Sequence, residues 1–236
     1  MGKHVEDLVA VYAGSLPTLK PLLTAWTQVV LRYCDNEGYC DNPWWFNERA
    51  TLSTLAAAAW TLDGWAALEE FNTRKRGGIV PKDRTDEGSR HGRCDLYVSH
   101  KRGHSYAIEA KQAWQAIGND ADAEATNLMM AAAWDDVGKL DKEEAKRRLA
   151  VTFVIPFLAK KIANVPNAGI EHTRSVVDDW LRTNPIDALD RTPHAYAWVF
   201  PGNTAEFYNG KSGRVFPGVL MLIEERLRAQ RRTAER

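Results

Sequence analysis

The stretch that decides the fold spans residues 91–112 and reads His-Gly-Arg-Cys-Asp-Leu-Tyr-Val-Ser-His-Lys-Arg-Gly-His-Ser-Tyr-Ala-Ile-Glu-Ala-Lys-Gln. Two runs of alternating side chains flank a polar turn that contains a glycine, which is the pattern of a β-hairpin. One face then carries two carboxylates and an amine, from Asp95, Glu109 and Lys111. The predicted apolar face consists of Cys94, Leu96, Val98, Tyr106, Ile108 and Ala110.

The register of this hairpin decides whether its two carboxylates meet. If Ser99 pairs with Ser105 around a loop of residues 100–104, Asp95 falls directly across from Glu109. Cross-strand neighbours lie about 4.5–5.5 Å apart at Cβ, so two like charges there repel each other. A hard divalent cation between them would turn that repulsion into a binding site. Lys111, on the same face, is placed to contact a phosphate or a water on the metal.

Composition bounds the class of protein. The 236 residues include 44% hydrophobic and 26% charged side chains, which predicts one sizeable domain or a core fold with an added helical segment. The 31 basic and 31 acidic side chains cancel, so any attraction to nucleic acid must be local. Three cysteines without a Cys-x-x-Cys pair favour a reducing cytoplasm and give none of the common zinc patterns.

Several function classes lack their sequence signals. The first residues have no apolar signal-peptide core, and the longest uncharged apolar stretches are too short to span a bilayer, so we expect a soluble cytoplasmic protein without membrane contact. No Gly-rich phosphate loop appears, so no nucleotide cofactor is expected. A Gly-x-Ser-x-Gly elbow and a His-Glu-x-x-His motif are absent too, which argues against a serine hydrolase of that type and a zinc protease.

The remaining elements are predicted from periodicity and turn residues. Helices are expected at 4–33 with a break near 14–17, from the N-cap Asn47 to about Thr61, within 119–147, at 168–182, and over a last segment that carries Phe216, Val219, Leu220, Ile223 and Leu227. Strands are expected at 65–74, 150–158, 195–200 and 205–208, and loops at 34–45 and 76–92.

A third carboxylate stands at the start of the helix after Asn47. Glu48 shares a helical stripe with Leu52, Leu55 and Ala59, which should face the core. A buried carboxylate needs a partner such as a metal, a basic side chain or a water. Alternatively, Glu48 simply interacts with the helix dipole at the first helical position.

Basic residues gather around the hairpin. Residues 74–102 contain nine basic and four acidic side chains, either as a solvated loop or as a phosphate-binding surface. The candidates for nucleic-acid contact are Arg74, Arg76, Arg90, Arg93, Lys101 and Arg102. The run Trp44-Trp45-Phe46 could stack on bases, or fix the helix start to the core. Asp135 and Asp136 are interpreted as a solvated helix face.

These residues resemble the PD-(D/E)XK nuclease superfamily, in particular uncharacterised bacterial and phage members. Its signature is an acidic residue on a first helix, an aspartate at the start of one strand, and Glu/Asp-x-Lys on the next. Here these positions look like Glu48, Asp95 and Glu109-Ala110-Lys111, over roughly residues 46–156. Cys94 replaces the usual proline before the aspartate.

The resemblance implies a fold. It implies an α/β (α+β) domain over 46–236 with a restriction-endonuclease-like core, in which a central mixed sheet is flanked by helices. Residues 1–45 would form an N-terminal helical extension packed on that core.

It also implies a metal-dependent nuclease that hydrolyses DNA. Asp95, Glu109, the Ala110 carbonyl and Glu48 would hold Mg²⁺ or Mn²⁺, and Lys111 would orient or deprotonate the attacking water. Gln112 and His91 are auxiliary candidates. Double-strand cleavage would require a homodimer or two successive nicks. The alternative is a catalytically silent module of this fold that binds nucleic acid or a protein partner in a phage or bacterial system.

Overall fold

The computed structural model describes residues 6–76, 89–118, 122–140, 145–159, 169–183, 185–202, 208–209 and 212–227. The helical elements of these residues are η1 (Pro17–Leu19), α1 (Lys20–Asn36), α2 (Glu48–Trp60), α3 (Glu124–Lys139) and α5 (Gly169–Arg182). The strands are β1 (Leu8–Tyr12), β2 (Trp65–Arg76), β3 (Ser89–His100), β4 (His104–Ala116), β5 (Arg147–Ala159), β6 (Ala195–Phe200), β7 (Tyr208–Asn209), β8 (Arg214–Val215) and β9 (Val219–Glu225).

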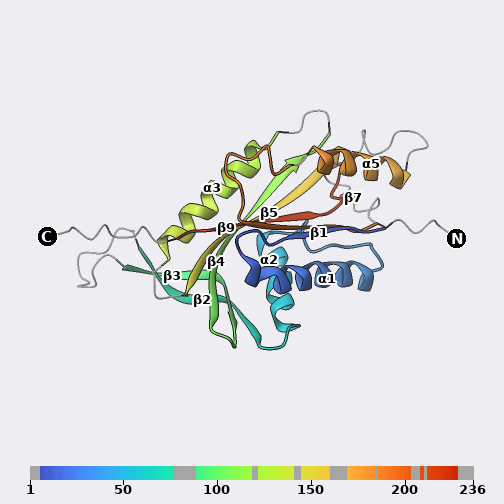
Figure 1. Ribbon diagram of the computed structural model, residues 1–236. Helices are drawn as coiled ribbons and strands as arrows, with labels where there is room; N and C mark the ends of the chain where they lie inside the picture. Colours follow the sequence, from blue (N-terminus) through green and yellow to red (C-terminus); the bar gives the residue numbers. More distant parts are fainter. Residues whose placement is uncertain are drawn as a thin grey trace.

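The strands form one mixed sheet in the order β1-β6-β9-β5-β4-β3-β2, with β8 paired to the end of β5 and β7 paired to β8. The pairing of β4 with β5 is parallel, with α3 as the crossover, and the other pairings are antiparallel. Helices α1 and α2 cover one face of the sheet, and α3 and α5 cover the other (Figure 1). The predicted mixed sheet flanked by helices is therefore confirmed.

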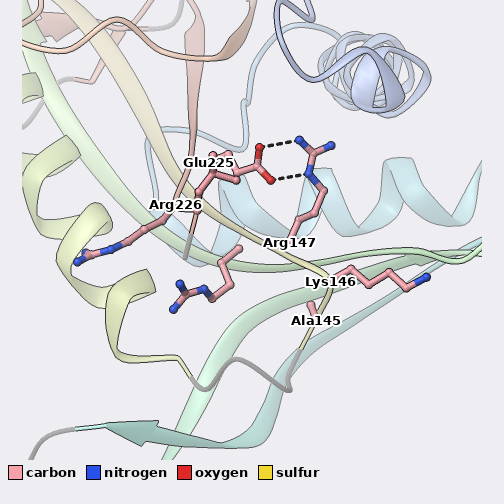
Figure 2. A pocket seen from close by; sticks show the side chains of 7 residues that line it. Ala145, Lys146, Arg147, Glu225 and Arg226 are labelled. Atoms are coloured by element: carbon pink, nitrogen blue, oxygen red, sulfur yellow. Dashed lines mark hydrogen bonds and ion pairs between the residues drawn. The ribbon is translucent and has the colours of Figure 1, made fainter. Parts of the chain in front are cut away.

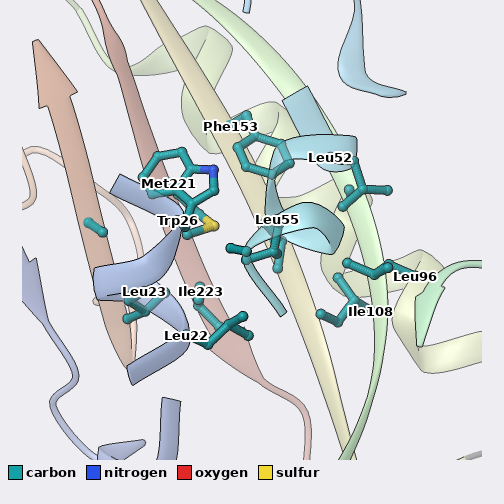
Figure 3. Close-up of a cluster of buried hydrophobic side chains, with 14 of the residues drawn as sticks. Leu22, Leu23, Trp26, Leu52, Leu55, Leu96, Ile108, Phe153, Met221 and Ile223 are labelled. Atoms are coloured by element: carbon teal, nitrogen blue, oxygen red, sulfur yellow. The ribbon is translucent and has the colours of Figure 1, made fainter. Parts of the chain in front are cut away.

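The larger core lies between the sheet and the pair α1–α2. Side chains from both helices converge there on Phe153 of β5 and Met221 of β9 (Figure 3). The indole of Trp26 is fully buried and donates to Thr54 Oγ1 at 2.8 Å, which ties α1 to α2. The opposite face is filled by separate clusters beneath α3 and α5.

Helix α2 starts where its cap predicts. The Asn47 side chain accepts a hydrogen bond from Ala50 N at 2.9 Å, so it satisfies one of the free amides of the first turn. Leu52, Leu55 and Ala59 are buried, as their spacing requires. Glu48 is consequently fixed at the first helical position, beside the sheet.

Three expected elements are wrong. Residues 219–225 form the strand β9, not a helix, because this apolar run lies between β5 and β6 and is buried on both faces, where helical periodicity is uninformative. Residues 8–12, expected as helix, form the edge strand β1 and pair with β6. Residues 89–92, expected as loop, extend β3. The N-terminal segment thus adds a strand and a helix to the same sheet and core.

The predicted apolar face of the hairpin is also wrong at one residue, Cys94. Leu96 and Val98 lie in the core beneath α1 and α2, but Cys94 packs with Ala107 and Val137 beneath α3. The neighbouring strand is irregular beside Cys94. Strand β2 pairs with β3 on both sides of Glu70, but Glu70 itself has a left-handed φ of 50°. No helix within the described ranges is long and apolar enough to cross a membrane.

Candidate active site

Strands β3 and β4 separate where the predicted carboxylates lie. Their ladder runs from His100–His104 to Leu96–Ile108 and includes the predicted Ser99–Ser105 pair. Beyond this ladder, β3 remains paired with β2 and β4 remains paired with β5, so β3 and β4 no longer pair with each other. We call this point of separation the β3–β4 fork. Asp95 and Glu109 are the first residues past the ladder. Asp95 Oδ2 accepts a hydrogen bond from Ala110 N at 2.8 Å, in place of the missing ladder bond.

Glu109 is a buried acid, with only 2% of its surface exposed. Burial and then the nearby charge of Asp95 raise its pKa to about 7, although the hydrogen bond from Lys75 opposes the rise. Lys75 Nζ lies 2.8 Å from Oε1 and 2.9 Å from Oε2. The ammonium therefore supplies the cationic partner that a buried carboxylate needs.

Lys75 reaches Glu109 across a glycine. It belongs to β2, and its aliphatic chain passes over Gly92 of β3, where an added Cβ would lie 2.6 Å from Lys75 Cγ. Any side chain at residue 92 would displace this lysine. Sequence reasoning did not assign Lys75 to the site, because the pair depends on how β2 registers on β3.

Lys111 lies on the same face as Glu109, as its alternation predicts. Its Nζ is 2.8 Å from Asp136 Oδ2 of α3 and donates to the Ala110 carbonyl at 3.0 Å. Burial lowers the pKa of Lys111, but the hydrogen bond to Asp136 and the charge of Glu48 outweigh burial and raise it overall. The side chain is thus held as an ammonium.

Asp136 is not the solvated residue that the sequence indicated. It pairs with both Lys111 and Lys139, each at 2.8 Å, whereas Asp135 is 75% exposed. Helical periodicity could have separated these two acids. Asp136 borders the buried helical stripe that contains Ala133 and Val137, and Asp135 points away from that stripe.

Glu48 belongs to the same electrostatic cluster, although α2 and α3 cover opposite faces of the sheet. Its pKa is raised, first by burial and then by the charges of Asp95 and Asp136, while Lys111 opposes the rise. These charges act on Glu48 at the level of the sheet where the β3–β4 pairing has ended.

Gln112 serves the scaffold. It faces α2, where its Oε1 accepts from Thr51 Oγ1 at 3.3 Å and its Nε2 donates to the Trp44 carbonyl at 3.3 Å. Trp44 is fully buried and donates to the Phe216 carbonyl at 3.1 Å, so it anchors the helix start to the core. Phe46 is 57% exposed.

Glu70 bridges α2 and β3 from a left-handed backbone conformation. Its carboxylate forms ion pairs with Arg49 of α2 and with Arg93, the latter at 3.0 Å. A non-glycine residue at φ of 50° is strained, and such strain persists where surrounding contacts hold it. Arg49 follows Glu48 in the chain and Arg93 lies two residues before Asp95, so this bridge ties together the segments that carry two of the acids of the site.

The predicted phosphate-binding cations are dispersed. Lys101 lies at the hairpin turn, about 20 Å from Asp95 at the usual rise per residue, and pairs with Asp63. Arg102 is exposed on the same turn. The side chains of Arg74, Arg76, Arg90 and His91 lie outside the described residues.

The carboxylates of the fork do not form a ready metal cage. Across the described ranges, no group of three or more His, Cys, Asp or Glu side chains is arranged to hold a metal ion. Two carboxylates, Asp95 and Glu109, act on each other there, and the partner of Glu109 Oε1 is the Lys75 ammonium at 2.8 Å, in an ion pair without hydrogen-bond geometry. Comparisons with protein-family models, curated proteins and solved structures found no match to this chain.

Proposed function

We propose that this protein is a metal-dependent nuclease that hydrolyses DNA phosphodiester bonds at the β3–β4 fork, on a restriction-endonuclease-like core. One observation carries the proposal: two like-charged carboxylates, Asp95 and Glu109, are held together at a break in the sheet, with the ammonium of Lys111 beside them. Structural acids rarely gather this way, because their mutual repulsion and burial are costly.

The residues present fit a magnesium or manganese ion. Mg²⁺ is commonly bound by one or two carboxylates, with water and substrate phosphates completing the shell. Asp95 and Glu109 would supply the carboxylates, with the Ala110 carbonyl and Glu48 adjacent. When bound, the metal supplies positive charge that polarises the phosphate and lowers the pKa of an attacking water.

Lys111 acts in this scheme as a fixed positive charge. Asp136 raises its pKa, which opposes a role as a general base and favours stabilisation of charge that builds on the phosphate oxygens. Asp136 is a positioning residue, because it holds Lys111 without lying on the strands of the fork.

Lys75 must move for a metal to bind Glu109. Its ammonium lies within 2.9 Å of both carboxylate oxygens, so the two cations compete for the same acid. Removal of this lysine should therefore tighten metal binding.

A second candidate function is supported by the ion pairs of the same cluster. Lys75 pairs with Glu109, and Lys111 pairs with Asp136, so both lysines of the cluster have carboxylate partners without a metal. The protein would then be a catalytically silent module of this fold that binds nucleic acid or a protein partner.

Cleavage of linear and supercoiled DNA with Mn²⁺ or Mg²⁺ separates the two candidates. We expect metal-dependent cleavage by the wild type and its loss in Asp95→Ala and Lys111→Ala. Lys139→Ala is the matched control, because Lys139 also pairs with Asp136 but is half exposed. Full activity in Asp95→Ala would contradict the nuclease proposal, and DNA binding without cleavage in all variants would favour the silent module.

A further inference from the structure

The two ends of β5 gather different kinds of side chain. Its start lines a pocket of about 460 Å³ with the end of β9, where Glu225 accepts two hydrogen bonds from Arg147, one of them 2.6 Å long from Nη2 to Oε2 (Figure 2). At its other end, β5 lies beside the end of β4 and the short strand β8. Three aromatic rings meet there, from Trp114, Phe157 and Phe216.

Phe216 is the buried base of this group of rings. It is 4% exposed, and its carbonyl accepts a hydrogen bond from Trp44 Nε1 at 3.1 Å. The ring of Trp114 packs edge-on against it, with 5.2 Å between ring centres and 71° between ring planes, and Phe157 lies 6.3 Å away. Trp114 nevertheless keeps 37% of its surface exposed. A ring that is exposed and already held in place offers a stacking surface at a low cost in conformational entropy.

Arg214 adds a positive charge to this surface. Its side chain is exposed, and its guanidinium lies 4.0 Å from the ring centre of Phe157. None of the ion pairs among the described residues involves Arg214. Sites for single-stranded nucleic acid combine these two features, since a cation contacts the backbone while aromatic rings stack on the bases. We call the surface formed by Trp114, Phe157, Phe216 and Arg214 the aromatic platform.

The aromatic platform continues from the fork along β4. Residues 109–116 of this strand are paired with β5 and no longer with β3, so they form the edge of the fork. Lys111 and Trp114 lie three residues apart on this edge, about 10 Å at the usual rise per residue. Between them, Gln112 donates to the Trp44 carbonyl at 3.3 Å, which links the edge to the segment that also holds Phe216. A polynucleotide that follows this edge therefore contacts the ammonium of the fork and then the platform.

We propose that the aromatic platform stacks on the unpaired bases of single-stranded DNA, with Trp114 as the principal stacking residue and Arg214 as a contact to the backbone. Every base has a π-face, so such stacking accepts any sequence. A duplex hides these faces inside its base stack, and the platform thus selects DNA with a single-stranded segment. The inference rests on the proposed nuclease function, because it names the DNA that reaches the fork, but binding itself requires neither metal nor cleavage.

Fluorescence anisotropy in the presence of a chelator tests the platform, with three labelled probes of equal length: oligothymidylate, an abasic oligonucleotide and a duplex. The wild type should bind oligothymidylate about tenfold or more tightly than the abasic probe, which has the same charge and no bases. Trp114→Ala should lose this preference, and Trp114→Phe, which keeps a ring, should retain most of it. Trp60→Ala is the matched control, because Trp60 is a 62% exposed tryptophan at the opposite end of α2 from Glu48. Arg214→Gln should weaken the binding of both single-stranded probes, because their backbone charge is the same.

Several outcomes would overturn the proposal. They are equal affinity of the wild type for oligothymidylate and the abasic probe, tighter binding of the duplex, no binding of any probe, and an unchanged base preference in Trp114→Ala. Circular dichroism verifies that each variant is folded. Asp95→Ala should keep the base preference of the wild type, because binding is measured without metal. A protein that shows this preference but cleaves no DNA when metal is added would contradict the nuclease proposal and leave the platform in place.

Discussion

The fork between β3 and β4 and the pocket at the ends of β5 and β9 each contain a cation that lies across a glycine. Lys75 passes over Gly92 and ends on the buried carboxylate of Glu109. Arg226 fits against Gly138 and ends on a tryptophan ring and a carbonyl. At the fork the lysine ends on a carboxylate of the chain, whereas Arg226 ends on a ring face and a carbonyl, with the Asp135 carboxylate 3.9 Å away. The comparison predicts that Lys75 controls the charge of a buried acid and that Arg226 contributes mainly by packing against α3.

The largest effect should come from the residue that fixes Lys111. Asp136→Asn removes the carboxylate that holds this ammonium, so cleavage at saturating DNA should fall roughly 10–100-fold, as for other groups that orient an active-site residue. Steady-state cleavage rates measure it. Asp135→Asn is the matched control because its side chain is exposed one residue away, and an equal loss in both variants would remove Asp136 from the site.

The pH dependence of the free energy of unfolding should reveal the raised pKa of the buried Glu109. The folded-state pKa of Glu109 is about 7, above its unfolded value, so the protonated form is favoured in the native state. Its contribution to stability is complete below the unfolded pKa and is lost as pH rises through about 7. Between about pH 5 and pH 8 the wild type should lose roughly 2 kcal/mol relative to Glu109→Gln.

Urea unfolding of both proteins across this range measures the difference. Parallel pH profiles for the wild type and Glu109→Gln would show that Glu109 titrates normally and would contradict its raised pKa. Asp63→Asn, at an exposed acid, should leave the profile unchanged.

The two glycines give a direct contrast between the regions. Gly92→Ala should push Lys75 off Glu109, which destabilises the fold by roughly 1 kcal/mol or more at neutral pH and less in acid, where Glu109 is protonated. Gly138→Ala should displace Arg226 from Trp134 with little net loss of stability at either pH, because alanine favours the helix by roughly 0.5–1 kcal/mol. Urea unfolding at neutral and at acid pH measures both variants, and the same pH dependence in both would contradict the distinction between the two glycines.

The sequence predicted the hairpin well because its signals are local. Alternation and a glycine turn predict the Ser99–Ser105 pair, which the structure confirms. The ladder ends at Leu96–Ile108, so Asp95 and Glu109 do not form the predicted ladder pair, although the charge of Asp95 still acts on Glu109. Asn47 marked the start of α2 for the same reason, since a cap acts on its own first turn. Whether these acids bind a metal stays a prediction.

The sequence failed where a residue's neighbours come from distant segments. The run at 219–225 was expected as a helix because a strand buried on both faces shows no alternation. Lys75 and Asp136 reach the fork from β2 and α3, and their roles depend on tertiary register. The same holds for the pocket, which joins residues 145–148 to 225–227 only after β5 and β9 pair.

Calorimetric titration of Mn²⁺ tests the central claim most directly, with the wild type, Asp95→Ala/Glu109→Ala and Lys75→Met compared near neutral pH. We expect the wild type to bind the ion, the double variant to lose binding, and Lys75→Met to bind more tightly than the wild type, because the competing ammonium is gone. Equal binding by all three proteins, or no binding by the wild type and by Lys75→Met at millimolar metal, would contradict a metal site at the fork.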